Sequence, residues 1–356
     1  MGQAPSPLGV AMIGTGMVAR THLLAIRDAM PPVRLIGVLA RTRASAAAFA
    51  AEAAETLGHP VDVFPDLQAV VRDRAVRAAL ILTPPDARLD LVTPLAAAGK
   101  AILLEKPLGR TLAEAEAVVA ACSGACVPLG VVFQHRMREA SASALRLAGD
   151  GGLGRLGLVE IAVPWWRDQG YYDAPGRGTH ARDGGGVLIS QAIHTIDLAL
   201  ALAGEVAEVT AMTATTPLHR MEAEDVAVAG LRFACGAVGT LTASTASFPG
   251  ASESIRLHFE AASLTLAEGV LEVAWRDGRR ARHGETAATG GGADPMAFTH
   301  AWHQSVLEDF AAALREGRAP AITGADALAA HRLIDAITRS AAAGARVVLE
   351  PAGPTP

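Results

Sequence analysis

The first 133 residues of this 356-residue chain alternate short apolar runs with helical patterns, and this alternation constrains the fold more than any other feature. The predicted strands cover residues 8–16, 33–39, 76–82, 101–104 and 127–133, and the predicted helices cover residues 17–29, 44–57, 89–98 and 112–121. Apolar strands that alternate with helices form a parallel sheet with helices on both faces. The sequence therefore predicts an α/β fold whose first domain, residues 1–133, is a doubly wound parallel sheet.

The pattern changes after residue 134. Predicted strands at residues 156–163, 206–213, 226–233, 237–245, 255–260 and 270–275 have a single helical pattern, residues 187–203, between them. Strands without intervening helices form antiparallel sheets. Residues 299–316 and 324–343 are also helical patterns, and residues 284–296 read as a flexible loop. We therefore predict a second α/β domain over residues 134–356 with a mostly antiparallel sheet.

Composition limits the partners and the compartment. With 51% hydrophobic and 19% charged residues the chain can bury a large core, and its net charge of −5 argues against a nucleic-acid or anionic-membrane surface. No apolar run reaches the roughly 18 residues of a membrane span, and the N-terminal segment lacks the features of a secretory signal. The three cysteines show no zinc-ligand spacing, so we expect no metal site and a reducing, cytoplasmic location.

Lysine is rare in this chain. Of 31 Lys and Arg residues, only Lys100 and Lys106 are lysines. A lysine can be tuned to release a proton near neutral pH, whereas an arginine cannot. A lysine that survives in an arginine-biased chain can therefore mark a position where proton transfer matters, although chance survival explains it equally well.

A glycine turn follows the first predicted strand. The motif G-x-G-x-x-G/A is matched by residues 14–19, GTGMVA, at the start of a helical pattern. The first glycine permits a tight turn, the second lets a pyrophosphate approach the main chain, and the small Ala19 allows close helix packing. The helix N-terminus favours the anion. This context predicts dinucleotide binding at Gly14, Gly16, Met17 and Val18.

The end of the second predicted strand bears on the choice of cofactor. An acidic residue there would bind the ribose 2′-hydroxyl of NAD and repel a 2′-phosphate. Residues 39–43, LARTR, contain no acid, and the guanidinium groups of Arg41 and Arg43 suit a phosphate. We therefore expect NADP to be preferred, with NAD possible. The same arginines could equally form a solvated basic loop.

Further motifs resemble those of the Gfo/Idh/MocA family, the glucose–fructose oxidoreductase and inositol dehydrogenase group. They are Glu105-Lys106-Pro107 after the fourth predicted strand, Gly184-Gly185-Gly186 followed by His194 and Asp197, Thr83-Pro84, Ala98-Gly99-Lys100, and Gln134 with Arg136. The resemblance covers nearly the whole chain. It implies an N-terminal Rossmann domain and a C-terminal α/β domain whose open, mostly antiparallel sheet forms the subunit interface of a homodimer or homotetramer.

The resemblance also implies a set of functional residues. Lys106 corresponds to the family's lysine near the nicotinamide and the substrate hydroxyl. Further cofactor contacts are expected at Thr83, Pro84, Glu105, Lys106 and Gln134, and Arg136 is expected to bind substrate. One position departs from the family pattern, because Ser190 stands where an aspartate is common. Ser190 can orient a hydroxyl group or His194, but it cannot act as a carboxylate base.

A reaction scheme follows from these residues. Oxidation of a secondary alcohol needs a hydride acceptor and a base for the hydroxyl proton. The side chain of His194 suits the base because histidine titrates near neutral pH. Lys106 either shares this role or stays charged and stabilises the alkoxide, and Ser190 positions the substrate. Asp197, three residues beyond His194, is expected to be structural and to hold the imidazole.

Aromatic residues are 4% of the chain, yet four of them lie between residues 165 and 172. Aromatic faces with polar neighbours suit a polyhydroxylated ring. We therefore expect Trp165, Arg167 and Tyr172 to contact substrate, while the alternative is a packed interface loop. His300 and His303 are three residues apart on a helix, but no third ligand lies nearby in sequence, so a pocket edge or surface is favoured over a metal pair.

The favoured function is an NAD(P)-dependent oxidoreductase that acts on a secondary alcohol of a sugar, sugar derivative or cyclic polyol. Alternatives are a cis-dihydrodiol dehydrogenase, an enzyme that oxidises and re-reduces its substrate on a tightly held cofactor, and a non-catalytic dinucleotide-binding regulator. The presence of both Lys106 and His194 disfavours the regulator.

Overall fold

The computed structural model describes residues 6–287 and 298–350. The chain divides into two compact units. The first contains the described residues up to Gly109 together with Ala113–Gln134 and Thr299–Gly324. The second contains Arg110–Leu112, the described part of His135–Phe298, and the described residues from Ala325 onward. The predicted loop at residues 284–296 lies largely outside the described residues.

The first unit is built on a sheet of parallel strands. They are β1 (Leu8–Ile13), β2 (Val33–Leu39), β3 (Asp62–Val63), β4 (Ala78–Ile81), β5 (Ala101–Glu105) and β6 (Leu129–Val132). The spatial order β3-β2-β1-β4-β5-β6 reverses between β1 and β4, and every neighbouring pair is parallel. This confirms the predicted doubly wound sheet, in which ligands bind at the carboxyl ends of the strands beside the reversal.

Helices surround this sheet. They are α1 (Ala19–Asp28), α2 (Arg43–Leu57), α3 (Leu67–Arg72), α4 (Arg88–Ala97), α5 (Leu112–Gly124) and α9 (Ala301–Glu316). The sequence analysis placed α9 in the second domain, but α9 packs on α1, β5 and β6 of the first unit. A Cβ at Gly130 of β6 would lie 2.8 Å from the Phe310 ring of α9, so glycine permits this close packing. The chain thus returns to the first sheet after residue 299, a crossing that no local pattern signals.

The second unit contains a sheet with nine described strands in the order β14-β13-β12-β11-β7-β10-β9-β8-β15. They are β7 (Leu156–Pro164), β8 (Val206–Ala214), β9 (Val226–Phe233), β10 (Val238–Ser244), β11 (Ser254–Phe259), β12 (Ala262–Ala267), β13 (Val270–Trp275), β14 (Arg280–His283) and β15 (Val347–Val348). Neighbouring strands are antiparallel except for β7 and β10. The predicted mostly antiparallel sheet is confirmed, with β12, β14 and β15 as strands that the sequence analysis did not foresee.

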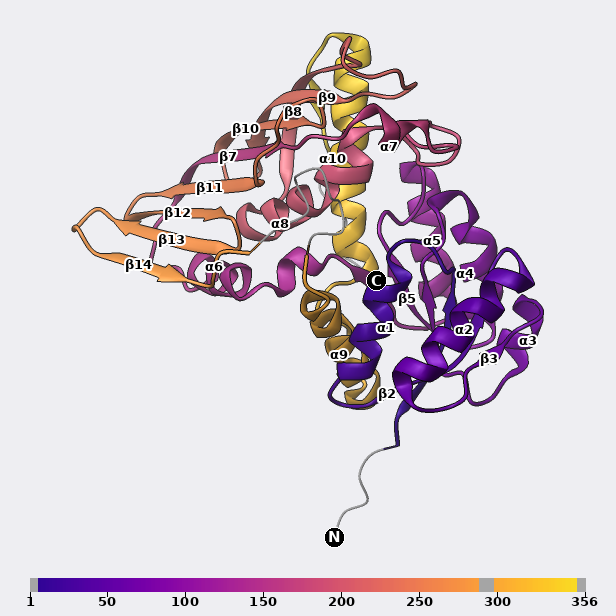
Figure 1. The fold of residues 1–356 in the computed structure, drawn as a ribbon. Coiled ribbons are helices and arrows are strands. Elements are labelled where there is room, and N and C mark those ends of the chain that lie inside the picture. The colour runs from indigo at the N-terminus through magenta and orange to yellow at the C-terminus, as the bar shows by residue number, and fades with distance from the viewer. Residues whose placement is uncertain (1–5, 288–297, 351–356) are drawn as a thin grey trace. The chain divides into compact units, whose positions relative to one another are not determined.

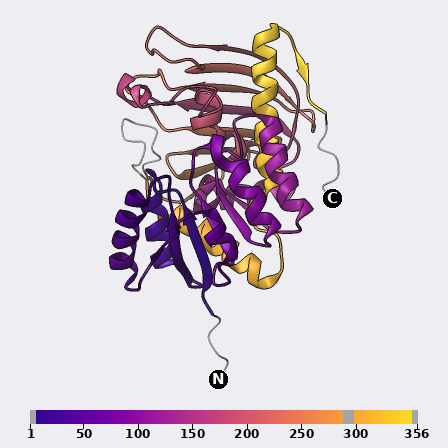
Figure 2. The same cartoon turned by 90° about the vertical axis from the view of Figure 1, so that its right-hand side faces the viewer.

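One face of this second sheet is covered by helices. They are α6 (Glu139–Gly149), α8 (Ile193–Ala203) and α10 (Gly324–Ala343), and the short α7 (Gln169–Asp173) follows β7. Helices α6 and α8 lie beside β11–β13 (Figure 1), and α10 crosses the strands (Figure 2). Buried and exposed residues alternate along β8, β9 and β10, which is the pattern of a sheet with one covered and one open face. None of the helices described is long and apolar enough to cross a membrane.

Candidate active site

The glycine turn between β1 and α1 has the geometry that its motif requires. Gly14 has a φ of 105°, which L side chains rarely adopt, and a Cβ there would lie 3.1 Å from the Leu82 carbonyl carbon. The Gly14 N–H donates to the Leu39 oxygen at 2.8 Å. A Cβ at Gly16 would meet no atom within 4 Å. The turn is therefore tight on the side of the sheet and open at Gly16.

The N-terminus of α1 suits an anion. Val18 at the N-cap makes no side-chain cap hydrogen bond, and the first turn contains no acidic residue. The preceding Met17 is 54% exposed. Uncapped N–H groups and the helix dipole favour a pyrophosphate at this end. The turn and the helix start therefore fit the dinucleotide that the sequence predicts.

Other predicted cofactor contacts follow the carboxyl ends of β4 and β6. Thr83 Oγ1 and Gln134 Oε1 are buried and have no hydrogen-bond partner among the described residues. Pro84 is the N-cap of the 3₁₀ helix η1 (Pro85–Ala87). Buried polar atoms are nearly always hydrogen-bonded in native proteins, so the two orphan oxygens agree with a ligand at this edge.

The segment after β2 is basic and exposed. Arg41 and Arg43 are both exposed, and the described residues provide no hydrogen bond or ion pair to either guanidinium. Thr42 lies between them and caps α2 by accepting a hydrogen bond from the Ser45 N–H. The short turn thus presents two cations and no carboxylate.

Glu105 ends β5, and its carboxylate is used inside the first unit. The residue is 6% exposed, and its Oε1 lies 2.8 Å from His22 Nε2 and 3.8 Å from His303 Nε2. Burial by itself raises the Glu105 pKa, but the His22 hydrogen bond and nearby positive groups, Lys106 among them, lower it to about 2. Arg88 donates to the carbonyl oxygens of Glu105 and Lys106. Glu105 therefore anchors the main chain that carries Lys106, and its carboxylate is engaged by histidine.

The cluster of His22, Glu105 and His303 was missed by the sequence analysis, which placed His303 at a pocket edge or surface. The three side chains come from α1, β5 and α9, and their ligand-type atoms lie within 4.8 Å of one another. The separation of 2.8 Å between His22 and Glu105 is that of a hydrogen bond. Burial lowers the His303 pKa to about 3, so this imidazole is neutral at pH 7.

Lys100, the other lysine, has a structural role. Its Nζ donates to the Asp73 carbonyl oxygen at 2.6 Å and to the Val76 carbonyl oxygen at 2.7 Å. Burial lowers its pKa, and the residue is 8% exposed. Lys100 therefore satisfies main-chain acceptors between α3 and β4. The surroundings of the two lysines distinguish their roles, whereas the residue count alone could not.

Each glycine of the GGG segment has a steric reason. Gly184 has a φ of 85°, and Gly185 has a φ of 154°. A Cβ at Gly186 would overlap the Glu224 carbonyl oxygen and lie 2.7 Å from its carbon. The Glu224 carboxylate accepts hydrogen bonds from the Gly186 and Leu188 N–H groups, both at 3.1 Å. Glu224 thus caps the segment from outside its sequence, and no motif in the chain points to it.

The segment after GGG begins as a π-helix. Hydrogen bonds of this wider type span η3 (Leu188–Ala192), and α8 starts at Ile193. In a continuous α-helix, the spacing of four residues would put Ser190 and His194 on one face, but the π turn changes the rotation between them. Short π segments occur frequently at functional sites.

His194 is 6% exposed and stacks on a second histidine. The His135 ring lies with its centroid 4.7 Å from that of His194, and the rings are inclined by 22°. His135 belongs to η2 (Gln134–Met137) and also lies 3.8 Å from a Glu253 oxygen. The sequence analysis did not single out His135, since no spacing connects it with His194.

Asp197 is structural, but its partner is different from the predicted imidazole. Its two oxygens accept hydrogen bonds from Arg136 Nε and Nη2, both at 2.7 Å, and Arg136 Nη1 donates to Asp326 at 3.0 Å. Burial raises the Asp197 pKa, and the guanidinium opposes this shift. The nitrogens of Arg136, an expected substrate contact, are thus engaged by two carboxylates.

The aromatic segment packs on itself in the second unit. Trp165, Arg167 and Tyr172 are 5%, 3% and 7% exposed. The Arg167 guanidinium lies 5.2 Å from the Trp165 ring centroid and 5.8 Å from that of Tyr171. The Tyr172 hydroxyl is 2.6 Å from Thr245 Oγ1, and burial raises its pKa. The structure therefore brings the three predicted substrate residues together in a buried cluster.

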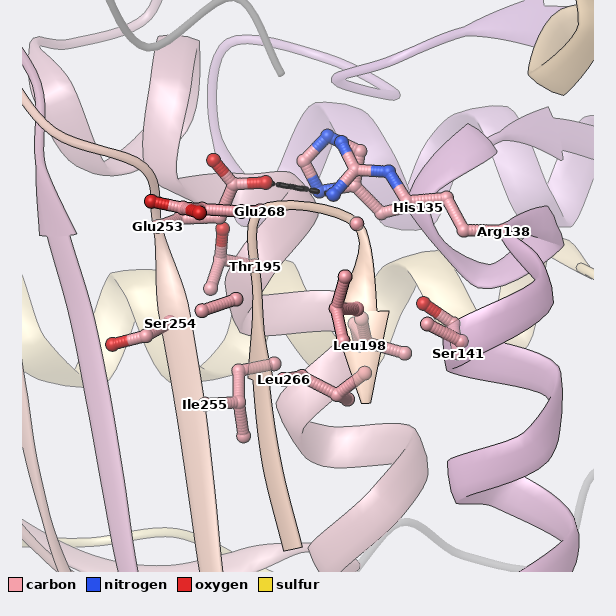
Figure 3. A pocket seen from close by; sticks show the side chains of 14 residues that line it. His135, Arg138, Ser141, Thr195, Leu198, Glu253, Ser254, Ile255, Leu266 and Glu268 are labelled. Carbon is pink, nitrogen blue, oxygen red and sulfur yellow. Dashed lines mark hydrogen bonds and ion pairs between the residues drawn. The ribbon is translucent and has the colours of Figure 1, made fainter. Parts of the chain in front are cut away.

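A pocket of about 20 Å³, enough for an ordered water molecule, lies between α8, η2 and the second sheet (Figure 3). His135, Arg138 and Glu253 gather at one end, and Leu198, Ile255 and Leu266 line the other. Arg138 Nη1 donates to Glu253 at 2.7 Å, which makes a buried ion pair. The pocket is therefore lined both by His135, whose ring stacks on His194, and by the Arg138–Glu253 ion pair.

Two family models match this chain. The model of the oxidoreductase family with an NAD-binding Rossmann fold matches residues 8–133, and the GFO/IDH/MocA C-terminal domain model matches residues 142–265. Together they cover more than half of the chain.

Similar proteins cover nearly the whole chain. D-apiose dehydrogenase of Paraburkholderia graminis is 28% identical over 96% of this chain and 89% of that protein. Inositol 2-dehydrogenase of Rhizobium meliloti is 30% identical over 93% of this chain and 96% of that protein. Levoglucosan dehydrogenase, solved with NADH and levoglucosan, is 25% identical with a TM-score of 0.81 over 96% of this chain and 99% of that one.

A further solved structure, the WlbA dehydrogenase from Bordetella pertussis with NADH and UDP-GlcNAcA, is 27% identical with a TM-score of 0.80. It covers 97% of this chain and 99% of that chain. The family models, the relatives and the parallel sheet with its glycine turn agree. The chain therefore belongs to the GFO/IDH/MocA family of nicotinamide-dependent oxidoreductases.

Proposed function

We propose that this enzyme transfers a hydride between NAD(P) and a secondary alcohol of a sugar, sugar derivative or cyclic polyol. The observation that carries the proposal is Lys106 directly after β5 of a dinucleotide-type sheet, in a chain similar along its length to D-apiose and inositol dehydrogenases. Residues 1–133 would supply the cofactor contacts, and the second unit would supply the substrate contacts.

The nicotinamide, when bound, supplies the hydride acceptor for the carbinol carbon. His194 takes the hydroxyl proton during oxidation and returns it during reduction. Lys106 polarises the hydroxyl oxygen and relays its proton towards His194, a role that needs an amine able to exchange a proton. Ser190 orients the hydroxyl group, and the cluster around Trp165 and Arg167 contacts the ring of the substrate.

A substrate panel tests this function. Reduction of NAD and NADP would be followed by nicotinamide absorbance with inositol, levoglucosan, D-apiose, L-sorbose and a cis-dihydrodiol. We expect turnover with a member of the sugar and polyol group. Turnover confined to the dihydrodiol, or cofactor binding without any turnover, would contradict the proposal.

The two lysines provide a matched pair for the catalytic assignment. We expect Lys106→Arg to lower kcat at least about a hundredfold, the effect of losing about 2.7 kcal/mol of transition-state stabilisation. His194→Ala should have a comparable effect. Lys100→Arg, a change at the structural lysine, should leave kcat within about threefold. Equal activity of all three variants and the original enzyme would exclude both assignments.

We also propose that NADP is preferred over NAD. Arg41 and Arg43 are exposed beside the end of β2, where no acid would repel a 2′-phosphate. The variant with both arginines changed to Ser should raise KM for NADP about tenfold or more, because charge-assisted contacts to phosphate are lost, and leave KM for NAD nearly unchanged. An equal change for both cofactors would contradict the preference.

We propose further that the enzyme is a cytoplasmic homo-oligomer that pairs through the open face of the second sheet. This face exposes Leu158, Met212, Val228 and Val238 from the adjoining strands β7, β8, β9 and β10. Exposed apolar patches of this kind mark interaction surfaces. Val228→Glu should convert the assembly to monomers in size-exclusion light scattering. Met30→Glu, at an exposed methionine of the first unit, is the control and should keep the assembly.

A further inference from the structure

The aromatic segment is clasped by the loop between β8 and β9. Gln169 Nε2 donates to the Arg220 oxygen at 3.2 Å, and the Arg220 N–H donates to Gln169 Oε1 at 2.8 Å. The Ala223 N–H donates to the Gly178 oxygen at 3.0 Å. The loop thus follows residues 165–178 closely, and one of its members, His219, reaches into the segment.

His219 bridges two acceptors in the interior. Its side chain is fully buried, its Nδ1 lies 2.8 Å from Asp225 Oδ2, and its Nε2 lies 2.8 Å from the Arg167 carbonyl oxygen. A carbonyl oxygen can only accept, so Nε2 carries a proton. A neutral imidazole has a single N–H, so Nδ1 either carries a second proton and donates it to Asp225, or carries none and accepts from a neutral Asp225 acid.

The surroundings of Asp225 favour the ionised pair. Its Oδ1 accepts a hydrogen bond from the Thr216 N–H at 2.8 Å, and its Oδ2 accepts one from the Thr216 hydroxyl at 2.6 Å. Hydrogen bonds donated to a carboxylate stabilise its charged form. The carboxylate therefore accepts two hydrogen bonds from Thr216, and these favour an ionised Asp225 with the shared proton on the imidazole.

The rings around His219 also suit a cation. The Trp166 centroid lies 5.6 Å from the imidazole centroid, and that of Tyr172 lies 4.9 Å away. Aromatic rings at such distances attract a positive charge. The titratable Tyr172 phenol also adjoins the imidazole, whereas the Arg167 guanidinium lies beside the Trp165 and Tyr171 rings.

The main chain of Arg167 is hydrogen-bonded at both its N–H group and its carbonyl oxygen. Its N–H donates to the Thr245 oxygen at 2.9 Å, and its carbonyl oxygen accepts from His219. The Thr245 N–H in turn donates to the main-chain carbonyl oxygen of Asp225 at 2.9 Å. Thr245 Oγ1 contacts the Tyr172 hydroxyl. The main chain of Arg167 and the ring of Tyr172 are therefore oriented by one network centred on Asp225.

We propose that both ring nitrogens of His219 carry a proton and that His219, together with Asp225, acts as a positioning pair for the substrate-binding segment. Loss of the pair frees the Arg167 carbonyl and leaves a buried carboxylate without its counter-ion, so the segment rearranges. The effect on substrate binding rests on the proposed function, which puts Arg167 and Tyr172 at the substrate. The charge state of His219 does not depend on that function.

Imidazole nitrogen NMR tests the charge state directly. The full-length enzyme labelled with ¹⁵N at histidine would be recorded at pH 7, and the His219 signals assigned by their loss in His219→Gln. We expect both His219 nitrogens at the positions of protonated imidazolium nitrogens. A nitrogen at the position of an unprotonated imidazole would overturn the proposal, whatever the substrate of the enzyme is.

Kinetics test the positioning role. His219→Gln and Asp225→Asn should each raise KM for the best polyol of the panel about tenfold while kcat changes less than about threefold, because ground-state positioning is lost. The matched control is His300→Gln, which removes another His–Asp pair of 2.8 Å, with Asp28 in the first unit, and should leave KM unchanged. An unchanged KM in both folded variants, checked by circular dichroism, would refute the positioning role.

If no panel member turns over, the proposed function fails on that result, and the NMR experiment still decides the charge of His219. If the variants fail to fold, the His219 signals would be assigned through bond correlations to the sequentially assigned main chain, and the spectrum of the unmodified enzyme then decides the protonation of both nitrogens.

Discussion

Replacement of Gly186 by alanine tests how closely the GGG segment approaches its neighbour. The added Cβ would overlap the Glu224 carbonyl oxygen and lie 2.7 Å from its carbon and 2.8 Å from its nitrogen. All three are main-chain atoms of a residue that leads into β9, so no flexible side chain can move aside. Val187 or Glu224 must shift, and the hydrogen bonds between the two segments are lost.

The size of the effect follows from those hydrogen bonds. The Val187 N–H donates to the Glu224 oxygen at 2.9 Å, and two further N–H groups donate to its carboxylate at 3.1 Å. A neutral hydrogen bond contributes about 1 kcal/mol and one to a charged group about 1.5 kcal/mol or more, so three bonds contribute about 4 kcal/mol. Burial raises the Glu224 pKa, and the hydrogen bonds from the Leu188 and Gly186 N–H groups oppose this shift.

Urea unfolding followed by tryptophan fluorescence measures this effect. Trp165, Trp166 and Trp275 lie in the second unit, so the signal reports mainly on the unit that carries Gly186. We expect Gly186→Ala to lower the free energy of unfolding by about 4 kcal/mol and to abolish turnover, because the π segment before His194 is displaced.

The matched control is Gly149→Ala at the end of α6. Gly149 is helical, and a Cβ there would meet no atom within 4 Å. This variant should be as stable as the original enzyme or up to about 1 kcal/mol more stable, because alanine favours the helix. A Gly186→Ala enzyme that unfolds at the same urea concentration as Gly149→Ala would refute the steric argument.

Three further predictions concern buried charges. Glu105→Gln should remove a pH-dependent part of the stability, because the Glu105 pKa is about 2 in the folded enzyme and 4.5 ordinarily. Ionised Glu105 stabilises the fold by about 3 kcal/mol above pH 5, and urea titrations of the original enzyme should show this contribution lost as the pH falls towards 2. Lys100→Met should lower the free energy of unfolding by about 2 kcal/mol, since two main-chain acceptors lose their donor, while KM stays constant. Arg136→Met should cost about 3–5 kcal/mol in the same assay, because Asp197 is left as an uncompensated buried carboxylate. The Glu105 argument would be contradicted if Glu105→Gln and the original enzyme lost stability equally as the pH falls. A changed KM in Lys100→Met, or an unaltered urea midpoint in Arg136→Met, would contradict the other two.

The local patterns of the sequence predicted much of this protein. The strand–helix alternation and the turn at Gly14 predicted the parallel sheet, and the predicted limits of β2, β9, β13 and α10 agree with the structure. Such features are properties of short segments, because burial on both faces produces continuous apolar strands and a tight turn requires glycine wherever it occurs. The family motifs extended the prediction to nicotinamide-dependent oxidoreductase chemistry.

The tertiary structure determined which side chains meet. His22 and Glu105 are 83 residues apart, and Arg136 meets Asp197 across 61 residues and Asp326 across 190. Contacts between residues distant in sequence also put α9 in the first unit and let Glu224 cap the GGG segment.

The two lysines illustrate the division. The sequence singled out Lys100 and Lys106 because both survive in an arginine-biased chain, and it could not tell a structural lysine from a candidate catalytic one. Only the folded chain placed two carbonyl oxygens at the Lys100 ammonium and a buried carboxylate next to Lys106. The role of an ionisable group depends on the solvation and partners that folding provides, and residues distant in sequence supply those partners.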